Sequence, residues 1–270
     1  MTRTRFEVPV GSARLAGERW TGDRAPLVLL HAGVADRRGW ADLAGRLDGT
    51  VIAYDRRGHG ETPPSSEPFT HLEDLWAVLD AVTEGPAWLV GNSMGGALAL
   101  DAALTAPERV AGLVLIAPAV GGQPEPDELD ADTMRIVGPL EAAEGAADIH
   151  EQLRLHAWLW LDGPGAAEGR VGGRARTLAL EMNERILRNA VPEDEGESAV
   201  DAWSRLEEIS VPTALIWGDL DVPFGIETCQ AVAARVPGAR AHVIAGAAHL
   251  PSLERPEELA RLIQASTSGR

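Results

Sequence analysis

The chain has 270 residues and a mass of 28.6 kDa, which suits one large domain or a core domain with an insertion. Apolar residues make up 45% of it, so we expect a sizeable hydrophobic core rather than disorder. The net charge of −17 argues against nucleic acid and anionic membrane surfaces as partners. A small-molecule substrate is the expected partner, and the sequence leaves room for a homo-oligomer.

Two features of the composition exclude whole classes of chemistry. All 24 basic residues are arginines, so a lysine Schiff base, pyridoxal phosphate attachment and a phosphate-loop lysine are excluded. Cys229 is the only cysteine, which excludes an internal disulfide and a thiolate metal cluster. We therefore expect neither a metal nor a cofactor. The N-terminal segment lacks the apolar core of a signal peptide and no run reaches membrane-spanning length, which predicts a cytoplasmic protein.

Strand and helix patterns alternate along most of the chain. Residues 5–20 alternate around Gly11 and predict an antiparallel hairpin. Nearly continuous apolar runs predict buried strands at 26–31, 50–55, 87–92, 110–118, 212–219 and 239–246. Apolar residues spaced three and four apart predict helices at 71–84, 94–106, 225–236 and 256–266. This alternation predicts an α/β fold with a doubly wound, mostly parallel sheet.

The alternation breaks between residues 121 and 207. No strand-like run occurs there, and two helical patterns are joined by links rich in glycine and proline. We therefore predict a core domain formed by 1–120 and 208–270, with an all-helical cap at 121–207 inserted between the sixth and seventh main strands.

A single serine stands between glycines at the predicted strand-to-helix junction at 91–95. The segment "GNSMG" matches G-x-S-x-G, and the strand before it and the helix after it are the setting that this motif requires. The turn places Ser93 in strained backbone geometry and projects its hydroxyl at the carboxyl edge of the sheet. The N-terminus of the following helix favours developing negative charge. We predict that Ser93 is a nucleophile.

A serine nucleophile needs a base, and the base needs an acid that orients it. His249 lies in the loop after the last predicted strand, where it could meet Ser93. The loop before that strand offers Asp219, which we expect to cap a turn, and Asp221, which lies further out and is the favoured acid. The order Ser93, Asp221, His249 is the one expected for this fold. The other histidines are His31 and His59 in glycine-containing turns, His150 and His156 in the insertion, and His71 and His242 at positions that look peripheral.

Five motifs in order resemble those of the α/β-hydrolase superfamily over nearly the whole chain. They are "LLHAG" (29–33), "YDRRGHGET" (54–62), "GNSMGG" (91–96), "GDLDVP" (218–223) and "GAAHLPSLERPEEL" (246–259). The resemblance maps the acid onto Asp221 and implies an oxyanion hole formed by the backbone N–H groups of Gly33 and Met94. Ala32 replaces the glycine usual after the first histidine, which restricts the backbone there.

The resemblance implies a serine hydrolase that cleaves an ester or lactone bond of a small, fairly apolar substrate through an acyl-enzyme. The histidine loop is similar to that of simple esterases and enol-lactonases. An alternative is a carbon–carbon bond hydrolase of ring-cleavage products, a group in which "GNSMGG" is frequent. That group typically carries tryptophan after the histidine, where this chain has Leu250. A non-catalytic ligand receptor is a minor alternative, and a dehalogenase is disfavoured because it uses aspartate at the elbow.

The cap is expected to cover the site and to select the substrate. Its Trp158, Trp160 and Met134 are candidate substrate contacts, as is Leu250 beside His249. Large apolar side chains on helices also serve packing, so both roles stay open for these four residues.

Overall fold

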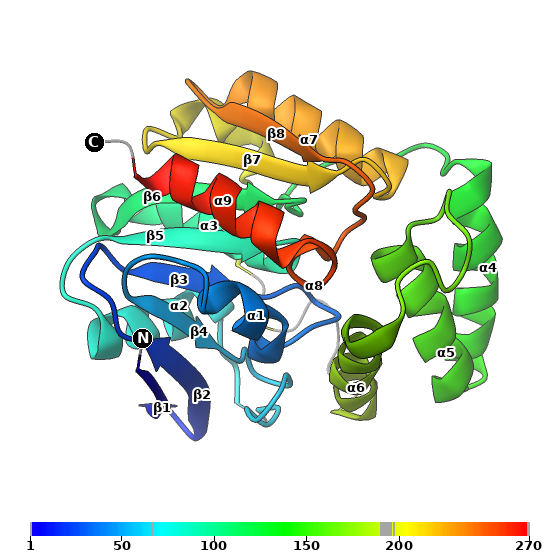
Figure 1. Ribbon diagram of the computed structural model, residues 1–270, viewed down its shortest axis with the longest axis horizontal. Coiled ribbons are helices and arrows are strands. Elements are labelled where there is room, and N and C mark those ends of the chain that lie inside the picture. The colour runs from blue at the N-terminus through cyan, green and yellow to red at the C-terminus, as the bar shows by residue number, and fades with distance from the viewer. Residues whose placement is uncertain (1, 66, 190–195, 197, 269–270) are drawn as a thin grey trace.

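One eight-stranded sheet runs through the computed structural model, which describes residues 2–65, 67–189, 196 and 198–268 (Figure 1). Its strands are β1 (Arg3–Val10), β2 (Ala13–Trp20), β3 (Leu27–Leu30), β4 (Val51–Tyr54), β5 (Ala87–Asn92), β6 (Val110–Ile116), β7 (Thr213–Gly218) and β8 (Arg240–Ile244). Their order across the sheet is β1-β2-β4-β3-β5-β6-β7-β8.

The pairing brings six strand ends to one edge. β1 and β2 form an antiparallel hairpin that turns at Gly11, whose φ of 57° suits glycine. β2 is also antiparallel to β4, whereas β4, β3, β5, β6, β7 and β8 are parallel to one another. The carboxyl ends of these six strands therefore meet at one edge, where open α/β sheets bind their ligands.

Helices cover both faces of the sheet. Alternate residues of a strand point to opposite faces, so Val28 and Leu30 join one apolar cluster while Leu27 and Leu29 join the other. The first cluster is closed by α2 (His71–Val82), α3 (Met94–Thr105) and α7 (Pro223–Arg235). The second is closed by α1 (Ala41–Ala44) and α9 (Pro256–Thr267), which lie in front of the sheet in Figure 1.

A group of helices stands beyond the carboxyl ends of the strands, at the right of Figure 1. It consists of α4 (Ala131–Gly145), α5 (Ile149–His156), a π-helical turn (Ala157–Asp162) and α6 (Gly173–Asn189). No strand occurs among the described residues of 121–207. The end of this range returns to the core, because Ala202 and Leu206 pack in the first apolar cluster. Residues 131–189 are thus the part that stands apart from the sheet.

All six predicted buried strands, the hairpin and the four predicted helices of the core are present, with ends shifted by a few residues. The sequence analysis missed short elements: the 3₁₀ turns Arg37–Trp40, Pro107–Arg109 and Trp203–Glu208, and the one-turn helices α1 and α8 (Pro251–Glu254). One-turn elements carry too few residues to show a hydrophobic period. Within the described part of the chain, no helix combines the length and the hydropathy needed to cross a bilayer.

Candidate active site

Ser93 occupies a sharp turn between β5 and α3. Its φ of 55° and ψ of −119° lie outside the regions that side-chain-bearing residues normally adopt. A Cβ on Gly91 would lie 2.1 Å from the carbonyl oxygen of Gly95, and a Cβ on Gly95 would lie 2.1 Å from that of Leu30. Both neighbours must therefore be glycine for the turn to close. The backbone N–H of Ser93 donates to Ile116 O at 3.0 Å, which ties the strained residue to β6.

Asp221, and not Asp219, meets His249. The two carboxylate oxygens of Asp221 lie 2.9 and 3.1 Å from His249 Nδ1. Asp219 instead accepts from the backbone N–H of Gly246 at 2.6 Å and fastens the turn after β8. Because a carboxylate accepts hydrogen bonds, the ring proton of His249 sits on Nδ1, and Nε2 keeps the lone pair that a general base needs.

His249 and Ser93 come from loops far apart in the sequence, yet they line the same two cavities. The backbone of His249 is held from two sides: Asn92 Nδ2 donates to its carbonyl at 3.1 Å, and its N–H donates to Trp160 O at 3.2 Å. Trp160 belongs to the π-helical turn, and its ring centroid lies 4.7 Å from that of His249. The segment that stands beyond the sheet thus contacts the candidate base directly.

A buried ion pair fixes the other end of the histidine loop. Both carboxylate oxygens of Glu254 accept from the backbone N–H of Ala248 at 3.0 Å. Glu254 also pairs with Arg170, which donates to the carbonyls of Gly246 and Leu161 at 2.8 Å. Burial raises the pKa of Glu254, although Arg170 and the N–H bonds oppose the shift. Arg170 therefore links the cap segment to the loop that carries His249.

Gly33 and Met94, the two candidate oxyanion donors, line the larger cavity together with Ser93. Met94 is the first residue of α3, so its N–H has no acceptor within the helix. A Cβ on Gly33 would lie 2.7 Å from Met94 Sδ, so a larger residue there would displace the flexible Met94 side chain.

His31 couples the loop after β3 to the turn after β4. Its Nε2 accepts from the backbone N–H of Arg56 at 3.0 Å, so the proton sits on Nδ1, which donates to Ala32 O at 2.9 Å. Burial, followed by the nearby Arg56 guanidinium, holds the pKa of His31 well below its ordinary value. This neutral imidazole is a structural bridge beside the loop that carries Gly33.

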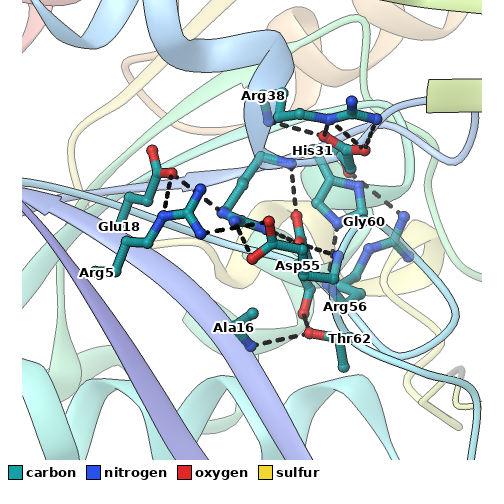
Figure 2. A network of polar contacts seen from close by, with 12 residues as sticks. Arg5, Ala16, Glu18, His31, Arg38, Asp55, Arg56, Gly60 and Thr62 are labelled. Carbon is teal, nitrogen blue, oxygen red and sulfur yellow. Dashed lines mark hydrogen bonds and ion pairs between the residues drawn. The ribbon is translucent and has the colours of Figure 1, made fainter. Parts of the chain in front are cut away.

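Polar contacts around Asp55 hold the same turn in shape (Figure 2). The Asp55 carboxylate accepts from the N–H groups of Arg37 and Glu61 at 2.9 and 2.7 Å and pairs with the Arg37 guanidinium. Thr62 Oγ1 accepts from Ala16 N at 2.9 Å and donates to Asp55 O at 2.9 Å. Burial raises the pKa of Asp55 to about 6, although the Arg37 cation opposes the shift. These contacts give the charged turn a structural role.

Two cavities meet at Ser93 and His249. The larger, about 570 Å³, extends along α5 and α6 and has a mixed lining: Val34, Leu140, Ile186 and Leu187 are apolar, whereas Arg57, His59, His71, Glu144, Gln152, His156 and Asn183 are polar. The smaller, about 240 Å³, has a mostly apolar wall that includes Val120, Val222 and Phe224. Trp160, like Ser93 and His249, borders both cavities.

Only some of the expected substrate contacts lie at the two cavities. Met134 is 48% exposed on α4 and lies outside the described lining of both cavities. Trp158 also lies outside it, because its Nε1–H donates to Ala166 O at 3.0 Å and Arg135 covers its ring. Leu250 is buried in an apolar cluster with Leu161 and borders only a void of about 10 Å³ among the described cavities. Of the four candidates, Trp160 alone borders the two cavities at Ser93.

The sequence analysis missed several polar residues of the larger cavity. His71 looked peripheral, but it is 7% exposed and lines the cavity, and burial lowers its pKa to about 2. It shares a helix face with Leu75 and Val78, and this spacing in the sequence indicates that His71 lies on the buried face of the helix. Gln152 and Asn183 carried no comparable signal, since their helices are polar on most faces.

With this geometry in place, comparison with known proteins decides the family. A model of the alpha/beta hydrolase family matches residues 27–262. The chain belongs to this family. A pimeloyl-[acyl-carrier protein] methyl ester esterase of Neisseria meningitidis is 32% identical to this α/β hydrolase, over 89% of this chain and 76% of the relative. A 2-hydroxy-6-oxononadienedioate/2-hydroxy-6-oxononatrienedioate hydrolase of Burkholderia vietnamiensis is 27% identical, over 90% and 86%.

A solved structure supports the same assignment. The thermophilic esterase of Thermogutta terrifontis superposes on this α/β hydrolase with a TM-score of 0.74 at 25% identity, covering 98% of this chain and 97% of the esterase. The fold class predicted from the alternation of strands and helices is thereby confirmed, as is the resemblance drawn from the five motifs. The enzyme is a hydrolase of the esterase and lactonase type.

Proposed function

We propose that Ser93, His249 and Asp221 are the nucleophile, base and acid of a serine hydrolase that cleaves an ester or lactone bond of a small, mostly apolar substrate. The observation that carries the proposal is the cavity that Ser93 and His249 share, with Asp221 bonded to the far side of the imidazole. The ester-cleaving relatives at 32% and 25% identity support the reaction class.

The reaction follows from the tautomer of His249. Its Nε2 takes the proton from Ser93 as Oγ attacks the substrate carbonyl, and Asp221 stabilises the imidazolium that forms. The carbonyl oxygen becomes an oxyanion that accepts from the N–H groups of Gly33 and Met94, each contributing about 3 kcal/mol to transition-state stabilisation. His249 then protonates the departing alcohol, and water releases the acyl group through the same steps.

Hydrolysis of p-nitrophenyl acetate tests this proposal. The wild-type protein should turn over the ester, and Ser93→Ala should remove most of that activity while leaving the fold intact. Labelling with a fluorophosphonate, followed by peptide mass spectrometry, should place the adduct on Ser93. An unlabelled Ser93, or full activity in Ser93→Ala, would show that this serine is not the nucleophile. Absence of turnover by the wild-type protein would instead leave the ligand-receptor alternative.

A carbon–carbon bond hydrolase is the second candidate function. The relative from Burkholderia vietnamiensis carries such a substrate in its name, and the polar lining of the larger cavity suits an oxygen-rich compound. Leu250, buried where that group typically has tryptophan, weighs against it. A panel of simple esters, lactones and vinylogous diketones separates the two, because each candidate predicts the highest kcat/KM for a different part of the panel. The cytoplasmic location and the homo-oligomer considered from the sequence stay predictions.

A further inference from the structure

Three polar side chains of the cap segment meet in the wall of the larger cavity. Gln152 and His156 project from α5 and Asn183 from α6, and all three line the cavity that Ser93 also borders. Gln152 and Asn183 are only 7% and 5% exposed. Burying polar side chains in this way is unfavourable unless their hydrogen-bonding groups find partners.

Asn183 fixes the tautomer of His156. Its Nδ2 donates to His156 Nδ1 at 2.8 Å. An amide nitrogen can only donate, so Nδ1 is the acceptor and the ring proton sits on Nε2. Burial lowers the pKa of His156 to about 4, so the ring is neutral at physiological pH. His156 therefore offers one neutral N–H donor.

Three polar atoms of this wall are left without a partner among the described residues: His156 Nε2, Asn183 Oδ1 and Gln152 Oε1. None of the three is fully enclosed by protein. The other end of the Gln152 amide is already used, since Nε2 donates to Ala143 O at 3.2 Å. The wall thus presents one donor and two acceptors, and a hydroxyl group, which both accepts and donates, satisfies such a set.

The charges around the cavity favour a neutral ligand. Arg57 lines it, but its Nε and a terminal nitrogen each lie 2.8 Å from an oxygen of Asp74, so this cation is already paired. Glu144 also lines the cavity. A substrate carboxylate would meet a carboxylate there and would find no unpaired arginine among the described lining residues.

We propose that Gln152, His156 and Asn183 recognise a hydroxyl group on the larger arm of a neutral ester or lactone substrate. The hydroxyl oxygen accepts a hydrogen bond from His156 Nε2–H, and the hydroxyl group donates one to Asn183 Oδ1 or Gln152 Oε1. The apolar lining residues, among them Leu140 and Ile186, hold the carbon chain between this group and the scissile bond. This assignment rests on the proposed function and adds a substrate class to it.

Matched pairs of esters test the assignment. On the acyl side, p-nitrophenyl hexanoate is compared with p-nitrophenyl ω-hydroxyhexanoate and their longer homologues. On the alcohol side, hexyl acetate is compared with ω-hydroxyhexyl acetate. In at least one series the wild-type enzyme should prefer the hydroxylated ester about tenfold in kcat/KM, mainly through KM, as expected for one or two net hydrogen bonds. The ω-carboxylate analogue should be worse than both.

His156→Phe and Asn183→Leu should each abolish the preference, measured within each variant as the ratio of kcat/KM for the hydroxylated ester to kcat/KM for the unsubstituted ester. His150→Phe is the matched control, because His150 is exposed on the same helix and lies outside the cavity lining. It should keep the wild-type preference. Far-UV circular dichroism checks that each variant is folded. If one of the two variants does not fold, the other still tests the assignment.

Two kinds of failure are distinguishable. Turnover of plain esters without a hydroxyl preference in either series overturns this assignment and leaves the proposed function standing. A preference that survives both variants, or a carboxylate arm that outperforms the hydroxyl arm, also overturns it. No turnover of any ester, together with an unlabelled Ser93, overturns the proposed function itself.

Discussion

The carboxylate of Asp221 lies 2.9 and 3.1 Å from Nδ1 of His249, and both side chains are almost completely buried. The two residues come from consecutive strand-end loops, after β7 and after β8. A second bond orients the carboxylate, because Asp221 Oδ1 also accepts from the N–H of Val222 at 2.8 Å. The acid is thus aligned before substrate arrives.

Asp221→Asn should lower kcat by roughly 10³- to 10⁴-fold, because an amide can favour the wrong imidazole tautomer. The measurement is kcat for p-nitrophenyl acetate, with the rate of fluorophosphonate labelling as a second readout. Asp219→Asn is the matched control two residues away. It removes the charge but keeps an oxygen that can accept from Gly246 N–H, so it should change kcat far less. Equal losses in the two variants would contradict the assignment of the acid.

Trp160→Ala should merge the two cavities at Ser93. Trp160 borders both cavities, so its removal should broaden the range of ester chain lengths that the enzyme accepts. Trp160 also packs on His249, so the imidazole should be less well oriented and kcat should fall. Trp158→Ala is a control from the same helical turn, since that indole bonds Ala166 O outside the two cavities. It should lower stability without altering the chain-length profile. An unchanged profile in Trp160→Ala would show that this indole does not divide the site.

Motifs with fixed backbone requirements made most of the site predictable. The turn at Ser93 has no space for side chains at positions 91 and 95, so the glycines there indicated the turn. The spacing after β7 indicated that Asp221 lies beyond the turn that Asp219 stabilises. The cap was less predictable, because the sequence pattern around an aromatic residue on a polar helix is the same whether the side chain packs in the interior or lines a cavity. Trp158 and Trp160 differ by two positions, yet only Trp160 faces the two cavities.

Gly225→Leu should fill the smaller cavity. Gly225 lies on α7 and lines that cavity, and a Cβ there would meet nothing within 4 Å. Replacing a helical glycine should also stabilise the helix by about 0.5–1 kcal/mol. The variant should therefore unfold at a higher denaturant concentration while losing activity toward esters with a bulky group on one arm. Varying the acyl and alcohol arms separately identifies which arm this cavity holds.

Gly138→Leu is the control for that substitution. Gly138 lies on α4, also with open space at its Cβ, and lies outside the lining of the cavities described. Its ester profile should match the wild type. If Gly225→Leu also keeps the wild-type profile for both arms, the smaller cavity takes no part in substrate binding.

Arg170→Ala should loosen the loop that carries His249. The Glu254 side chain would remain buried without its cation, whereas Arg170 is 21% exposed, so losing this partly buried pair should lower the free energy of unfolding by about 1–3 kcal/mol. Because Arg170 does not line the two cavities at Ser93, kcat should fall more than KM rises. Arg170→Lys should recover part of both losses. A fall in stability alone, with kcat unchanged, would limit Arg170 to a structural role.

Stability should fall as the pH drops from about 7 to about 5, because buried histidines are held neutral. Burial and the Arg56 cation lower the pKa of His59 to about 4 and that of His71 to about 2, from an ordinary value of 6.5. At a pH between the folded-state and unfolded-state pKa values of a histidine, the unfolded chain binds a proton there and the folded chain does not. Each histidine therefore removes up to about 1.4 kcal/mol of stability per pH unit on acidification.

Asp55 acts in the opposite direction. Its pKa is raised to about 6 from 3.8, so the folded state binds its proton first and gains stability as the pH falls through that window. His31 and His156 also have lowered pKa values, and Glu254 has a raised one. The four histidines together outweigh the two carboxyl groups, so the urea midpoint should be lower at about pH 5 than at about pH 7. His71→Phe removes one group that takes up a proton on unfolding, so the urea midpoint should depend less steeply on pH. His150→Phe, on an exposed surface, should leave the slope unchanged, and equal slopes in all three proteins would exclude His71 as a source of the acid sensitivity.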